Sequence, residues 1–262
     1  MPLSSLDLEA LARARRALEH PGLAIRIADA VGTPVEALVR RLPDGAQAAL
    51  GAGTRRALDA ALGVALRTLD RRGGGPSDWL HRGVAVASGA LGGAAGLPGL
   101  LVELPFSLTV MLRAIAAHAR AQGEDLTEVA ARLECLTVFA YGSRSPDDDA
   151  AESAYFAARV ALARAVSQAA EYVAERGIAG AAAERGAPAV VQLVARIAQR
   201  LGAAVSDKAA AQLLPVLGAA GGAAVNALFM SHYQETAWAH FTVRRLERAH
   251  GAEAVRAAYR AA

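Results

Sequence analysis

The chain of 262 residues contains little that would support a disulfide-stabilised or β-sheet fold. Its only cysteine is Cys135, which excludes an internal disulfide and fits a reducing compartment. Phe, Trp and Tyr together make up 5% of the residues, and alternating runs of Val, Ile, Thr and Tyr are missing, which argues against a β-sandwich or barrel. No alternation of strands and helices is visible either, which argues against an α/β sheet. We therefore predict an all-α fold.

Lysine is as rare as cysteine: 27 of the 28 basic residues are Arg, and the only Lys is Lys208. The chain has 25 acidic residues, a formal net charge of +3 and no basic run longer than two residues, so we expect no nucleic-acid partner. The first residues carry acids where a secretory signal needs a basic start and an apolar core. We therefore expect a cytoplasmic protein, which includes a peripheral position at the inner face of the cell membrane.

Sequence motifs of the common enzyme classes are also missing. The chain has no Walker A loop, no H-E-x-x-H, no G-x-S-x-G, no C-x-x-C and no Rossmann fingerprint after a strand. We therefore expect no bound cofactor, and the sequence alone assigns no reaction.

Small residues are abundant instead. Alanine fills 67 positions and glycine 25, and hydrophobic residues make up 54% of the chain. The mean hydropathy of +0.25 is high for an ordinary soluble domain. Such a composition is typical of helices whose backbones approach one another closely.

Two long segments, residues 83–102 and 209–234, carry no Asp, Glu, Lys or Arg. Both contain glycines four residues apart, which are Gly89/Gly93 and Gly92/Gly96 in the first segment and Gly218/Gly222 in the second. Both also contain a Leu-Pro step, at Pro98 and at Pro215. We predict a multi-helix bundle with two central glycine-rich apolar helical hairpins. Gly and Ala favour insertion into lipid only weakly, so we expect the hairpins to be buried or interfacial rather than membrane-spanning.

The predicted elements divide the chain into two parts. Residues 1–72 are predicted to form amphipathic helices, with a cap at Ser4 or Ser5 and a helix over 54–71. Residues 73–262 form the helical core, which we expect to be continuous with the first part in one globule. Within this core we predict a helix that carries Glu103 in its first turns and runs to Ala121, and an amphipathic helix from about Ala189 to Leu201.

Two carboxylates are candidate catalytic groups. Glu103 is the only charge between Arg82 and Arg113, and an ionised carboxylate there needs a cation, a metal or water. Its alternatives are a structural role at a helix start, an ion pair with an Arg, or a functional carboxylate. Glu134 is a similar but weaker candidate, and its neighbour Cys135 is predicted to be an inert core thiol.

A polar stripe on the last long helix is the candidate ligand-binding site. At about 100° per residue, Asn226, Tyr233, His240 and Arg244 share one face with apolar neighbours. They form either a polar pocket, with His240 as an acid, base or ligand, or a buried face that hydrogen-bonds to neighbouring backbones. His232 and Glu235 have the spacing of a metal-ligand pair but no visible partners, so we expect no metal site.

Several sequence blocks resemble the EcsC protein family. They are G-G-A-A-G-L-P-G at 92–99, E-L-P at 103–105, R-A-I-A at 113–116, G-E-D at 123–125, R-L-E-C-L at 132–136, L-L-P-V-L-G-A-A-G-G-A-A-V-N at 213–226, Y-Q at 233–234 and H-F-T-V-R-R-L-E at 240–247. The resemblance spans about residues 75–250. It implies a bacterial, helical, membrane-associated protein, and it transfers no catalytic residue because the family has no established activity.

Three functions remain open at this point. The first is a membrane-associated protein that binds lipid or another apolar ligand, and the second is a soluble helical module that binds a protein partner. The third is a metal-assisted hydrolase that uses Glu103, Glu134, His232 or His240. The oligomeric state is not indicated by the sequence.

Overall fold

The computed structural model confirms the all-α fold. It describes residues 3–19, 22–31, 35–40, 42–43, 45–69, 96–141, 153–183, 187–212 and 218–262, and in these ranges it contains helices and no strand. The helices are α1 (Ser5–Glu19), α2 (Gly22–Val31), α3 (Val35–Val39), α4 (Ala46–Thr68), α6 (Gly96–Ala121), α7 (Val129–Thr137), the 3-10 helix η1 (Val138–Ala140), α8 (Ala154–Ala183), α9 (Pro188–Gln212), α10 (Gly218–His250) and α11 (Ala252–Ala261).

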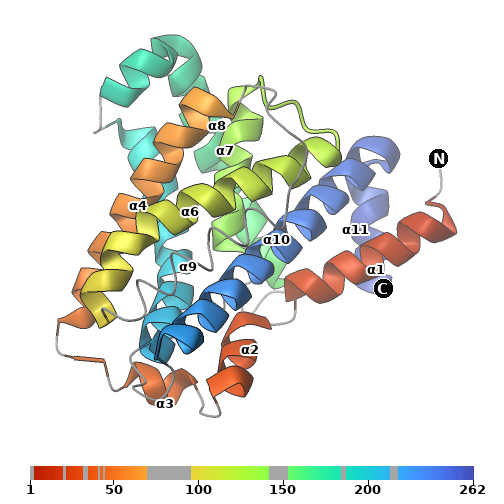
Figure 1. Cartoon of the computed structure of the whole chain (residues 1–262). Coiled ribbons are helices and arrows are strands. Elements are labelled where there is room, and N and C mark those ends of the chain that lie inside the picture. The colour runs from red at the N-terminus through yellow and green to blue at the C-terminus, as the bar shows by residue number, and fades with distance from the viewer. Residues whose placement is uncertain are drawn as a thin grey trace.

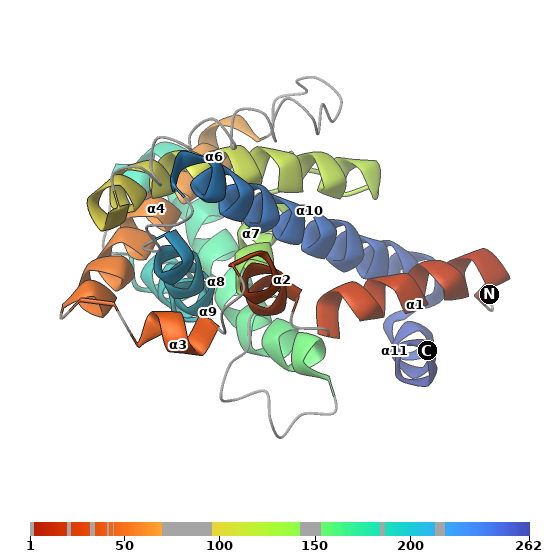
Figure 2. The ribbon, with the colours of Figure 1, turned by 60° about the horizontal axis from the view of Figure 1, so that its bottom comes forward.

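The longest helix, α10, connects the two ends of the bundle (Figures 1 and 2). Its 33 residues span about 50 Å at 1.5 Å per residue. Along this length it contacts α1, α2, α6, α9 and α11. Both chain ends lie at the α1 and α11 end (Figure 1).

The helix pair α4 and α6 forms one side of the bundle, packed against α9 and α10. The pair runs in the same direction, because Gly53 faces Leu101 near one end and Arg120 donates a hydrogen bond to the Leu69 carbonyl near the other. A Cβ added at Gly53 would lie 2.5 Å from Leu101 Cδ2, so this glycine permits the close approach of the two helices.

Several predicted helix boundaries are confirmed by the local contacts. The α1 start is capped by Ser4, whose Oγ accepts a hydrogen bond of 3.2 Å from the Asp7 N–H. The α6 helix ends at Ala121 as predicted, just before Gly123, whose φ of 81° favours glycine. Glu103 lies in the second turn of α6.

Other elements are longer than predicted. The helix predicted over 54–71 begins at Ala46, and the helix predicted to end near residue 201 continues to Gln212. Gly51, Gly53 and Gly202 lie inside these helices, where tertiary packing outweighs their low helix propensity.

The glycine pairs predicted at 89–96 lie largely outside the described residues, as do residues 213–217. The predicted glycine-rich hairpins are therefore described only in part, through α6 and α10. These two helices contact each other.

Candidate functional site

A buried polar cluster joins α6, α9 and α10; we call it the lysine cluster. Its members are Glu103 and Ser107 from α6, Lys208 from α9 and Asn226 from α10. Lys208 Nζ lies 3.3 Å from both carboxylate oxygens of Glu103 and donates a hydrogen bond of 2.7 Å to Asn226 Oδ1. Ser107 Oγ also donates a hydrogen bond to Glu103. All four residues are buried, so the cluster places an ion pair in the interior.

Lys208 is completely buried although its side chain carries an amine. Burial lowers the pKa of Lys208 below its ordinary value, while the carboxylate of Glu103 opposes the shift. The Phe229 ring lies 5.1 Å from Nζ and closes another side of the ammonium group. An Arg at this position would need more space and partners for five N–H donors, whereas the compact ammonium group of a lysine has only three. This difference explains why the chain's only lysine suits this site.

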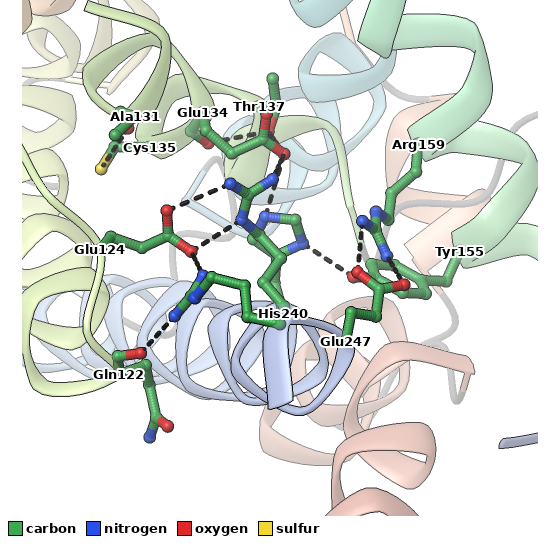
Figure 3. A network of polar contacts seen from close by, with 12 residues as sticks. Gln122, Glu124, Ala131, Glu134, Cys135, Thr137, Tyr155, Arg159, His240 and Glu247 are labelled. Carbon is green, nitrogen blue, oxygen red and sulfur yellow. Dashed lines mark hydrogen bonds and ion pairs between the residues drawn. The ribbon is translucent and has the colours of Figure 1, made fainter. Parts of the chain in front are cut away.

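A second cluster lies where α7, α8 and α10 meet; we call it the histidine cluster (Figure 3). The Tyr155 hydroxyl hydrogen-bonds to His240 Nδ1 at 2.8 Å. His240 Nε2 lies 3.1 Å from Glu134 Oε1, a contact that becomes an ion pair only when the imidazole is protonated. The His240 ring is fully buried, and the ring of Tyr141 lies 4.8 Å from it.

Arginine side chains surround this histidine. Arg244 donates hydrogen bonds of 2.8 and 3.1 Å to Glu124, and it lies 3.7 Å from Glu134. Arg159 binds Glu247 through two hydrogen bonds of 2.8 Å each (Figure 3). These pairs join α8 and the segment between α6 and α7 to α10.

The charges of this cluster set the pKa values of its central pair. Burial alone would raise the pKa of Glu134, but His240, Arg244 and Arg159 together lower it to about 2. Burial lowers the pKa of His240, and contact with Glu134 opposes this shift. At neutral pH the pair is therefore a carboxylate beside a neutral imidazole.

The predicted site residues are divided between the two clusters. Asn226 and His240 are 14 residues apart on α10, which corresponds to about 21 Å at 1.5 Å per residue. Glu103 joins Asn226 in the lysine cluster, whereas Glu134 and Arg244 join His240. The structure therefore brings together two sets of predicted residues rather than one pocket.

The remaining predicted residues have other surroundings. The Tyr233 hydroxyl donates to the Phe139 carbonyl at 3.5 Å, which is a core contact. Glu235 forms an ion pair of 2.7 Å with Arg26 from α2. His232 is buried, and its Nε2 has no hydrogen-bond partner in the described part of the chain.

Neither cluster assembles ligands for a metal within the described residues, where no group of three His, Cys, Asp or Glu side chains has suitable geometry. Burial and nearby carboxylates raise the pKa of Cys135 far above its ordinary value, as expected for an inert thiol. The open groove between α8 and α9 is lined by Gln168, Glu171, Tyr172, Glu175, Pro188, Ala189 and Gln192, and by none of the predicted site residues.

Part of the α6 surface outside the lysine cluster is apolar and exposed; we call Pro98, Val102 and Phe106 the α6 outer face. Val102 is 82% exposed and Phe106 is 49% exposed. At 100° per residue these three side chains share an arc of about 80°, whereas Glu103 and Ser107 point 100 to 140° away from Val102. The helix therefore has a polar inner contact and an apolar outer surface.

Sequence reasoning missed three features. Lys208 stands out in the composition as the only lysine, but no local pattern shows that it pairs with Glu103. Tyr155 has no local signal, because its role depends on packing against α10. Val102 and Phe106 are exposed because of the way α6 is oriented in the bundle. Since α6 is apolar on most sides, the spacing of its apolar residues does not show which side faces the core.

The architecture defines an all-α bundle with an ion pair buried between two of its helices. The family model of the EcsC protein family matches residues 6–246, so the match includes the N-terminal helices as well as the core, and the chain belongs to this family. No curated protein and no solved structure matches the chain.

Proposed function

We propose that the protein binds lipid at a membrane surface through the α6 outer face. The observation that carries the proposal is the exposure of Val102 and Phe106 on neighbouring turns of a helix that otherwise lies in the core. Two large apolar side chains on one exposed face cost solvation free energy, and entry into a lipid interface would recover it.

The apolar character of α6 supports this proposal. Residues Leu97–Ala121 are long and apolar enough to cross a membrane, but more than half of this apolar stretch is buried in the bundle. A helix held by the protein on most sides fits contact with the lipid interface better than a full crossing.

The lysine cluster gives α6 a defined orientation in this proposal. Since most sides of α6 are apolar, hydrophobic burial alone distinguishes weakly between rotations of the helix about its axis. The contact of Glu103 with Lys208 is satisfied in one rotation, the one that directs Val102 and Phe106 outwards. In this proposal the buried ion pair determines how α6 packs and has no catalytic role.

Flotation of the purified protein with liposomes tests the proposal. We expect the protein to float with the vesicles, and we expect Val102→Ser/Phe106→Ser to weaken binding at least about tenfold, because each buried apolar side chain contributes about 1.5 to 3 kcal/mol. Val160→Ser is the matched control, since Val160 is 69% exposed on α8. Wild-type protein that stays below the vesicles in the gradient would overturn the proposal.

In the cell, this function corresponds to a peripheral protein at the inner face of the cell membrane. Fractionation without detergent tests this location: we expect part of the protein to sediment with membranes and the Val102→Ser/Phe106→Ser variant to remain in the supernatant. Equal sedimentation of the two forms would contradict docking through this face.

A further inference from the structure

Basic residues lie close to the α6 outer face. Arg113 is exposed on α6, and its Nη2 lies 3.5 Å from Thr68 Oγ1 at the end of α4. The preceding residue, Arg67, is also exposed. The side-by-side arrangement of α4 and α6 therefore brings the two arginines to the same end of the helix pair.

Helix geometry places Arg113 on the same face as the apolar side chains. At 100° per residue, Val102, Phe106 and Arg113 lie within an arc of about 40°. Eleven residues separate Val102 from Arg113, a distance of about 16 Å at 1.5 Å per residue. The face is therefore apolar at its start and basic at its end, about three turns later.

The charge balance of the two helices favours an anionic partner. Within the described residues of α4 and α6, four exposed side chains are basic and one is acidic: Arg55, Arg56, Arg67 and Arg113, and Asp59. The only other acid in these two helices is Glu103, which is buried against Lys208 and does not contribute to the surface charge.

We infer that the α6 outer face docks on bilayers that contain anionic phospholipids, with Val102 and Phe106 in the apolar boundary and with Arg67 and Arg113 on the headgroup phosphates. This inference rests on the proposed function and names its lipid class. A guanidinium group offers paired N–H donors that match phosphate oxygens. An interfacial helix with apolar and basic residues on one side gains both burial and electrostatic attraction at such a surface.

Two vesicle compositions and one pair of charge variants test the inference. The vesicles are phosphatidylcholine alone and phosphatidylcholine mixed with an equal amount of phosphatidylglycerol. On the mixed vesicles we expect Arg67→Gln/Arg113→Gln to bind about 30-fold more weakly than wild type, since each arginine near an anionic surface contributes about fivefold. Raising the salt concentration should reduce wild-type binding, because exposed charges are screened.

The matched control is Arg40→Gln/Arg164→Gln, which changes the net charge equally at exposed positions outside α4 and α6. Circular dichroism of each variant confirms that the fold is retained. On the mixed vesicles we expect the control to bind within about twofold of wild type, because the lost charges lie outside the two docking helices.

The outcomes separate the inference from the proposed function. Equal wild-type binding to both vesicle types would overturn the anionic preference and leave lipid binding intact, whereas no binding to either type would overturn both. Equal losses in the two charge variants would show a general charge effect and overturn the assignment of Arg67 and Arg113. A dimer that dissociates in Val102→Ser/Phe106→Ser, without vesicle binding, would make the face a contact between two copies of the chain.

Discussion

Lys208 Nζ lies 3.3 Å from both carboxylate oxygens of Glu103, so a single ion pair joins α9 to α6 in the interior of the bundle. Charges in such a place are costly unless paired, and here Asn226 and Ser107 complete the hydrogen bonding. The pair marks one side of an otherwise apolar helix, and this restricts the ways in which α6 can pack.

Removing one partner of this pair should destabilise the protein strongly. Lys208→Met leaves the Glu103 carboxylate buried without its cation, and we expect a loss of about 3 to 5 kcal/mol in the free energy of unfolding. Urea denaturation followed by circular dichroism measures this loss.

The matched variant replaces both charges. Lys208→Met/Glu103→Leu leaves no buried charge, so we expect it to recover most of the stability lost in Lys208→Met. If the loss in the free energy of unfolding of the double variant equals the sum of the losses in the two single variants, the two groups do not interact. If the pair defines the orientation of α6, the double variant should also bind vesicles more weakly than wild type.

His232 should make the protein sensitive to mild acid. Burial, together with the nearby charge of Arg26, lowers the pKa of His232 from 6.5 to about 4. Between these values the unfolded chain binds the proton and the native protein does not, so stability falls as the pH drops from 6.5 to 4, by about 3 kcal/mol for this group.

The His232→Leu variant isolates this contribution. Because Nε2 has no hydrogen-bond partner among the described residues, we expect the variant to lie within about 1 kcal/mol of wild type at pH 7.5. At pH 4.5 it should be the more stable of the two proteins. Parallel curves of stability against pH for both proteins would contradict the lowered pKa.

Tyr155 should contribute to stability through His240. Tyr155→Phe removes the hydroxyl that lies 2.8 Å from His240 Nδ1 and leaves this buried nitrogen without that partner. We expect a loss of about 1 to 3 kcal/mol in the free energy of unfolding. In a double-mutant cycle with His240→Leu the two losses should not add, and strict additivity would show that the contact is unimportant.

Two glycines of α4 provide a matched pair for helix packing. Gly63 lies inside the helix with nothing within 4 Å of an added Cβ, so Gly63→Ala should stabilise the protein by about 0.5 to 1 kcal/mol. Gly53→Ala should gain less, because Leu101 must move away from the new methyl group. Thermal unfolding of both variants measures the difference, and equal gains would argue against the close contact of α4 with α6.

The sequence was sufficient for the fold class and for several helix ends, because these depend on local signals. The Ser4 cap and the stop before Gly123 are encoded within a few residues of the helix end. The lengths of α4 and α9 were underestimated, since tertiary packing retains glycines that would weaken an isolated helix.

The site residues were predicted individually but not in their pairings. Glu103 was identified as a carboxylate that needs a cation, a metal or water, and an ion pair with an Arg was one of its alternatives; in the structure the cation is Lys208. Glu134 and His240 are about a hundred residues apart in the sequence, and their contact depends on how α7 packs beside α10. Contacts of this kind depend on how distant helices pack together, and no local sequence pattern indicates them.

The burial of Cys135 has a practical consequence. Its thiol is fully enclosed and donates a hydrogen bond of 3.4 Å to the Ala131 carbonyl, so thiol-directed reagents should leave the native protein unmodified. A cysteine introduced by Val102→Cys would then be the one reactive thiol among the described positions. An environment-sensitive fluorophore attached there would report directly, through its emission, whether this part of the surface leaves water when vesicles are added.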